Sequence, residues 1–187
     1  MKILRSIGIL AAGVALLTAV PACSDDAEAP AATPTVAAST QVDAAALVDL
    51  GIEQGKSGDI DQAKATFEQV LAADSDNKFA WFNIGYIAQS RNQVEDAITH
   101  YDKALSIDPE FRPALYNKAI AVEASDVRSA IDLYRKILSL DKRASTAHVR
   151  LGMLLSEKGD KEGAKDAFSA AVDIDAKLVD VIPGEYR

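Results

Sequence analysis

The sequence predicts an all-α protein in which four copies of a two-helix unit stack in order, preceded by an N-terminal segment of a different kind. Three observations predict this fold class. Small, aromatic, aliphatic and acidic residues recur every 33 or 34 residues in the part of the chain from position 44 onward. Within a copy, apolar residues follow the 3.6-residue period of an α-helix. The preceding residues, 24–43, show no such period.

The composition excludes several classes of protein. The chain has 187 residues, a net charge of −8, one Cys and two His. An acidic chain lacks the Lys/Arg surplus that phosphate neutralisation requires, so we expect no nucleic acid partner. One Cys cannot form an internal disulfide, and one Cys with two scattered His cannot supply a zinc site. We therefore expect no metal and no cofactor.

Residues 1–22 are predicted to be an export signal. Lys2 and Arg5 precede an apolar run from Ile7 to Val20, which is the order of a charged region and an apolar region in signal peptides. As a helix at ~1.5 Å per residue this run spans about 21 Å, short of the ~30 Å hydrocarbon core. A permanent transmembrane helix is therefore the weaker interpretation.

The residues after the apolar run are Val20-Pro21-Ala22-Cys23. This sequence resembles the lipobox of bacterial lipoproteins, and the resemblance implies that Cys23 is lipidated and becomes the first residue of the mature protein. The alternative is an ordinary secretory cleavage after Ala22, because Val20 and Ala22 also satisfy the small-residue rule. Cleavage before Cys23 removes two basic residues and no acidic one, so the mature net charge becomes −10.

Residues 23–43 are predicted to join the lipidated Cys to the repeats as a disordered tether. This stretch contains Pro30, Pro34, small residues and early acidic residues, and it cannot bury a core. As a flexible coil its length corresponds to an end-to-end distance of roughly 25 Å.

Five columns of residues recur in all four copies. They comprise an early small residue, a second small residue, an aromatic residue, an aliphatic residue and an Asp. The columns are Gly51, Gly85, Ala119, Gly152; Ala63, Ala97, Ala130, Ala164; Phe67, Tyr101, Tyr134, Phe168; Leu71, Leu105, Leu138, Val172; and Asp74, Asp108, Asp141, Asp175.

This pattern resembles the tetratricopeptide repeat, a 34-residue helix–turn–helix unit. The resemblance implies a right-handed α–α superhelix of repeats 44–77, 78–111, 112–144 and 145–178, with a short cap or tail at 179–187. A single repeat cannot bury its apolar face alone, so neighbouring repeats stack. The third copy is one residue short between its helices. The second copy matches best, at Trp81, Ile84, Gly85, Ala97, Tyr101, Ala104 and Pro109.

Physical reasons support several of these positions. Gly85 and Ala97 are small because the two helices of the repeat cross closely there. Gly58-Asp59 and Gly159-Asp160 mark turns, where Gly ends one helix and Asp caps the next. Asp108-Pro109 ends a helix, because Pro disfavours helical geometry in the preceding residue. The C-terminal edge is covered either by the short tail or by a partner.

The family resemblance also implies a concave groove lined by the first helix of each repeat. The groove is expected to be apolar and aromatic with polar edges, and to bind an amphipathic helix or an extended peptide. In the alternative, some of these residues pack between neighbouring helices. The expected groove residues are Val48, Ile52, Phe79, Phe82, Asn83, Tyr86, Tyr116, Asn117, Ile120, Val149, Arg150 and Met153.

We find no catalytic motif, and we expect a non-catalytic adaptor that binds protein partners in the bacterial cell envelope. His100 and His148 are expected to be surface or packing residues. Val48 and Ile52 occupy places where carboxylate-gripping cochaperones have polar residues, so we do not expect that activity. Because residue 24 is Ser and not Asp, the periplasmic face of an outer membrane is favoured over the outer face of a cytoplasmic membrane. The alternative function is a homo-oligomeric spacer that self-associates through its C-terminal edge.

Overall fold

The computed structural model describes residues 43–187. The predicted signal peptide (1–22), the lipidation site Cys23 and the tether up to residue 42 lie outside the described residues. The structural statements below concern residues 43–187.

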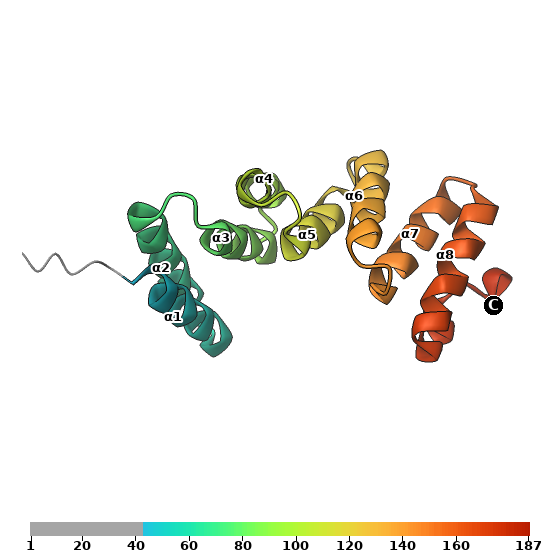
Figure 1. Ribbon diagram of the computed structural model, residues 1–187, viewed down its shortest axis with the longest axis horizontal. Coiled ribbons are helices and arrows are strands. Elements are labelled where there is room, and N and C mark those ends of the chain that lie inside the picture. The colour runs from blue at the N-terminus through green and yellow to red at the C-terminus, as the bar shows by residue number, and fades with distance from the viewer. Residues whose placement is uncertain (1–42) are drawn as a thin grey trace, which may run out of the picture. The chain divides into compact units, whose positions relative to one another are not determined.

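The described residues form eight α-helices and two short 3₁₀ helices (Figure 1). Each helix packs against the next one, and the first helices of repeats 1, 2 and 3 also contact in sequence order. This arrangement confirms the prediction of an all-α fold made of consecutive helix pairs. The helices are α1 (Ala44–Ser57), α2 (Ile60–Ala73), α3 (Lys78–Ser90), α4 (Val94–Ile107), α5 (Arg112–Val122), α6 (Val127–Leu140), α7 (Ser145–Glu157), α8 (Lys161–Ile174), η1 (Ala176–Val181) and η2 (Gly184–Tyr186).

The glycine column exists because an aromatic ring lies against it. A Cβ atom at Gly51 would lie 2.7 Å from Cε1 of Phe67, and one at Gly152 would lie 2.6 Å from Cε1 of Phe168. Gly85 has the same relation to the ring of Tyr101, at 2.8 Å. The rings in this column are buried in every repeat. The predicted close crossing of the two helices is therefore confirmed, and the ring of the second helix is what requires it.

The Asp column turns the chain from one repeat to the next. Each of these residues directly follows the second helix of its repeat, in an extended conformation. Its side chain accepts a hydrogen bond from the backbone N–H two residues later, at 2.9–3.2 Å in all four copies. Such Asx turns offer the backbone a local alternative to continuing the helix. The same geometry ends α4 at Asp108, before Pro109, as predicted.

The predicted turns between paired helices are confirmed at the glycines. Gly58 and Gly159 have φ values of 91° and 82°, which is the left-handed conformation of a helix C-cap. Asp160 caps α8 by accepting from the N–H of Gly163 at 3.0 Å. The prediction that Asp59 caps α2 is wrong, since its side chain makes no capping bond.

The residues three positions after Asp160 and Asp59 are Gly163 and Gln62, respectively. A Cβ on Gly163 would lie 2.6 Å from a carboxylate oxygen of Asp160. Asp59 has nearly the same φ as Asp160, but the residue at the corresponding place is Gln62.

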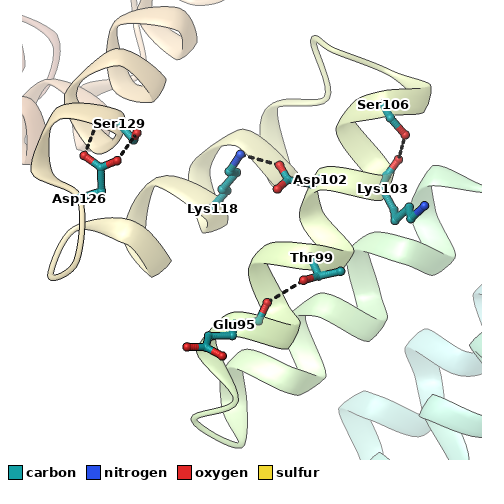
Figure 2. Close-up of polar contacts among 8 residues, drawn as sticks. All are labelled: Glu95, Thr99, Asp102, Lys103, Ser106, Lys118, Asp126 and Ser129. Carbon is teal, nitrogen blue, oxygen red and sulfur yellow. Dashed lines mark hydrogen bonds and ion pairs between the residues drawn. The ribbon is translucent and has the colours of Figure 1, made fainter.

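The third repeat accommodates its missing residue by shortening its first helix. α5 has 11 residues, whereas the other first helices have 13 or 14. Asp126 starts α6 by accepting from both the N–H and the hydroxyl of Ser129 (Figure 2). Lys118, which stands where an apolar residue is usual, extends its ammonium group to Asp102 of α4 (Figure 2).

The C-terminal residues close the last repeat. Ile182 is 2% exposed and belongs to the core of repeats 3 and 4. The ring of Tyr186 packs on Phe168 with centroids 5.2 Å apart, and its hydroxyl bonds to Ser156 Oγ at 3.0 Å. Of the two covers that the sequence allowed, the chain's own tail therefore fulfils this role. No helix in residues 43–187 is both long enough and apolar enough to cross a membrane.

Candidate peptide-binding groove

One face of α3 presents apolar groups to solvent. Phe79, Asn83 and Tyr86 are spaced i, i+4 and i+7, so they share a face of the helix. Phe79 is 48% exposed and Tyr86 is 56% exposed. Aromatic rings are usually buried, so two exposed rings on one helix face mark a surface suited to binding.

A pocket of about 420 Å³ lies beside this face, between α1, α2 and α3. The structure brings three predicted groove residues together here, Ile52, Asn83 and Tyr86. The walls are mainly apolar, with a few polar groups from Lys56, Asn83 and Ser90. The full lining is Gly51, Ile52, Gly55, Lys56, Ile60, Ala63, Phe67, Asn83, Tyr86, Ile87 and Ser90.

A second aromatic group surrounds the start of α5. Phe79 and Phe82 each meet the ring of Phe111 edge-on, with centroids 5.4 and 5.5 Å apart. The ammonium of Lys78 lies 5.3 Å from the Phe79 ring centroid and 5.2 Å from that of Phe111. Sequence reasoning missed Phe111 because it precedes its helix and so lies outside the expected groove positions.

The expected grouping of Phe79, Phe82, Tyr86 and Tyr116 is therefore divided among separate places. Tyr86 lines the pocket, whereas Tyr116 packs edge-on against Tyr134, with centroids 5.9 Å apart. Phe82 is half-buried and also lies 5.9 Å from the ring of Tyr101. Phe82 therefore contributes to packing as well as to the aromatic group at Phe111.

Two of the expected contact residues lie in the interior instead of the groove. Val48 is buried in the core cluster that contains Phe67 and Ile84, and Val149 is equally buried. A residue on the first helix of a repeat faces either the groove or the adjacent helices, and these two face the helices. Ile120 is half-buried, and Met153 packs against the core of repeats 3 and 4.

The polar groove residues already have partners within the chain. The side-chain amides of Asn83 and Asn117 donate to carbonyls four residues earlier, at 2.8 and 3.2 Å. Their amide oxygens remain as acceptors for a ligand. Arg150 donates to Glu123 at 2.9 Å, and Glu123 accepts the hydroxyl of Tyr134 at 2.6 Å. Burial, followed by this hydrogen bond to Glu123, raises the pKa of Tyr134.

Both histidines act in packing, as expected. The indole N–H of Trp81 donates to the Ser75 carbonyl at 2.8 Å, and Nε2 of His148 lies 3.1 Å from the corresponding carbonyl of Lys142. His148 therefore has the same position and the same kind of contact in repeat 4 that Trp81 has in repeat 2. His100 stacks on Trp81 and burial lowers its pKa. Within residues 43–187 no three His, Cys, Asp or Glu side chains gather as metal ligands.

A sequence profile described as "Tetratricopeptide repeat" matches residues 48–110 and 120–178, more than half of the chain. The chain belongs to the tetratricopeptide repeat family. Its helix pairs are therefore tetratricopeptide repeats, which form scaffolds for protein–protein interaction. The shortened end of α5, at Val122, falls within the second of these matched ranges.

Curated relatives share part of the chain. Protein STIP1 homolog of Dictyostelium discoideum is 33% identical over 98 residues, which is 48% of this chain and 17% of that protein. TPR repeat-containing protein MJ1428 of Methanocaldococcus jannaschii is 25% identical over 126 residues, 66% of this chain and 22% of that protein. This chain therefore spans less than a quarter of the length of these two relatives.

Solved structures show the same fold. The crystal structure of MamA protein has a TM-score of 0.66 and 22% identity, covering 73% of this chain and 75% of that chain. YrrB, described as a TPR protein with an unusual peptide-binding site, has a TM-score of 0.68 and 19% identity, covering 76% of this chain and 73% of that chain. The described residues thus form a solenoid of tetratricopeptide repeats.

Proposed function

We propose that this tetratricopeptide repeat protein is a lipid-anchored, non-catalytic adaptor of the bacterial cell envelope. It binds an apolar helix or extended segment of a partner protein against α1 and α3. The observation that carries this proposal is the exposure of Phe79 and Tyr86 on one face of α3, next to an open apolar pocket. Burial of exposed aromatic anchors in a groove is a common source of affinity in peptide recognition.

The anchor part of the proposal is supported by the sequence Val20-Pro21-Ala22-Cys23 after an export-type apolar run. Two or more acyl chains hold a protein at a membrane for long times, whereas one chain binds reversibly. Confinement near a membrane raises the effective concentration of the repeats for partners in the same layer. The periplasmic face of an outer membrane is the favoured location, with the outer face of a cytoplasmic membrane as the alternative.

A self-associating spacer is the weaker function. That function needs an uncovered C-terminal edge, and in the structure Ile182 and Tyr186 cover the last repeat.

The groove is tested with a photo-crosslinking amino acid placed at position 86 in the native host. We expect a crosslink to a distinct protein from position 86 and none to that protein from position 103, an exposed position on α4. Phe79→Ala should weaken the crosslink from position 86 while the far-ultraviolet circular dichroism stays helical. Equal crosslinking from both positions, or no effect of Phe79→Ala, would argue against the groove.

The anchor is tested separately by replacing Cys23 with Ser. We expect the wild-type protein to incorporate labelled palmitate and to partition into the detergent phase, and the Cys23→Ser variant to do neither. Label incorporation that persists in Cys23→Ser would exclude this residue as the attachment site.

A further inference from the structure

A column of polar residues lies four positions after the early small residue in repeats 2, 3 and 4. Its members are Gln89 in repeat 2 and Glu123 in repeat 3. Each accepts a hydrogen bond at 2.6 Å from the tyrosine hydroxyl of the second helix, Tyr101 or Tyr134. In these two repeats a tyrosine hydroxyl of the second helix therefore bonds to a polar side chain at the end of the first helix.

Repeat 4 makes the corresponding hydrogen bond with a tyrosine from elsewhere in the chain. Its column residue is Ser156, and its aromatic residue is Phe168, which has no hydroxyl. Tyr186 from the tail packs on Phe168 and bonds through its hydroxyl to Ser156 Oγ at 3.0 Å. The tail thus supplies the hydroxyl that this repeat lacks, on a second ring that packs against Phe168.

Repeat 1 has neither of these arrangements. Its column residue is Gly55 and its aromatic residue is Phe67, so it has no hydroxyl and no acceptor side chain at these places. The pocket of about 420 Å³ lies here, and Gly55 and Phe67 both line it. The position that is occupied by side chains in the other three repeats is open in repeat 1.

Helix packing does not require a glycine at position 55. A Cβ there would lie 4.0 Å from the Cβ of Ala63, an ordinary van der Waals contact, whereas one at Gly51 would lie 2.7 Å from the Phe67 ring. Glycine inside a helix is less stable than alanine. Because Gly55 has no side chain, the pocket beside it stays open.

We propose that this pocket binds a tyrosine side chain of the partner protein, in the manner in which repeat 4 binds Tyr186. The inference rests on the proposed adaptor function, since it names the anchor residue that the partner inserts. The partner's ring packs on Phe67. Its hydroxyl bonds to Ser90, whose own hydroxyl donates to the Ile87 carbonyl at 2.8 Å and so leaves its oxygen as an acceptor.

The net charge of the first two repeats bears on the charge of the partner segment. Residues 43–111 contain 13 acidic and five basic residues. Opposite charges across an interface steer association and suppress wrong partners. A partner segment that carries Lys or Arg is therefore favoured over an acidic segment.

The test uses a blocked pentapeptide, Lys-Gly-Tyr-Gly-Lys, titrated into the mature protein and followed by the backbone amide signals of Gly51 and Gly55. The same peptide with Ala in place of Tyr is the ligand control. We expect the tyrosine peptide to shift both signals, and the alanine peptide to shift them far less. Equal effects of the two peptides would overturn the inference.

Two variants close the pocket without disrupting the core. The double variant Gly55→Gln with Phe67→Tyr rebuilds the Gln89–Tyr101 pair of repeat 2, and Gly55→Ala is a milder change. Ala65→Gln places the same new side chain on an exposed part of α2 and serves as the matched control. Since anchors of this kind dominate peptide affinity, we expect the double variant to weaken binding by roughly tenfold or more, and Ala65→Gln to leave it unchanged.

The two proposals fail in different ways. If the double variant binds the tyrosine peptide as well as wild type, or still crosslinks its partner fully from position 86, the tyrosine pocket is overturned while the adaptor function stands. If wild-type protein captures no partner from position 86, the adaptor function fails, whatever the peptide does.

Discussion

At the scale of single residues, two glycines on α1 have opposite roles. Gly51 leaves room for the Phe67 ring, and a Cβ there would come within 2.7 Å of it. Gly55 lies one turn later and meets nothing closer than 4.0 Å. Both glycines weaken the helix by the same intrinsic propensity, so the difference between them is set by packing alone.

This contrast predicts opposite effects of one substitution. Gly51→Ala should lower the free energy of unfolding by about 1–3 kcal/mol, because the added methyl overpacks a well-filled core. Gly55→Ala should raise it by about 0.5–1 kcal/mol through helix propensity. Urea denaturation of both variants measures these effects, with Gly152→Ala as a second example of the Gly51 type. Equal shifts for Gly51→Ala and Gly55→Ala would contradict the packing explanation.

At the scale of the element, ion pairs connect the start of one helix with the end of its partner. Lys78, the first residue of α3, lies 2.5 Å from Asp108 at the end of α4. Arg112 at the start of α5 lies 2.6 Å from Asp141 at the end of α6. Repeats 1 and 4 have Ala44 and Ser145 at this helix start. In each of the two middle repeats, the ion pair therefore joins the start of the first helix to the end of the second helix.

The pair at Asp108 predicts a pH effect. The hydrogen bond from Lys78, followed by that from the Glu110 backbone N–H, holds the pKa of Asp108 below its ordinary value of 3.8. Because the folded-state pKa is lowered, the stabilisation is fully present above pH 3.8 and is lost as the pH falls through the lowered pKa. Lys78→Gln should raise the pKa of Asp108 in a carboxyl NMR titration. Lys103→Gln, an exposed change elsewhere on α4, should leave that pKa where it is.

At the scale of the whole molecule, the periodic part of the fold was predictable from the sequence. The contact between Gly85 and Tyr101 lies within one repeat and recurs, so spacing alone reveals it. The cover supplied by Tyr186 occurs once and has no period, so spacing cannot reveal it. Val48 is buried, and spacing alone does not show this, because a first helix has two apolar sides, one toward the groove and one toward its neighbours. The pocket at Gly55 becomes visible once the repeats are compared with each other in three dimensions.

Contacts between neighbours also determine how the molecule loses structure. In a solenoid, each repeat is stabilised by itself and by the adjacent repeats. Ile182→Ala removes a 2% exposed side chain from the last repeat, at a cost of about 2–5 kcal/mol. Amide hydrogen exchange should therefore quicken first in α7 and α8 and remain unchanged in α1 and α2. Val181→Ala is the matched control, since Val181 is 53% exposed and should alter exchange little. Uniformly faster exchange from α1 to α8 in Ile182→Ala would instead show that the four repeats unfold as one cooperative unit.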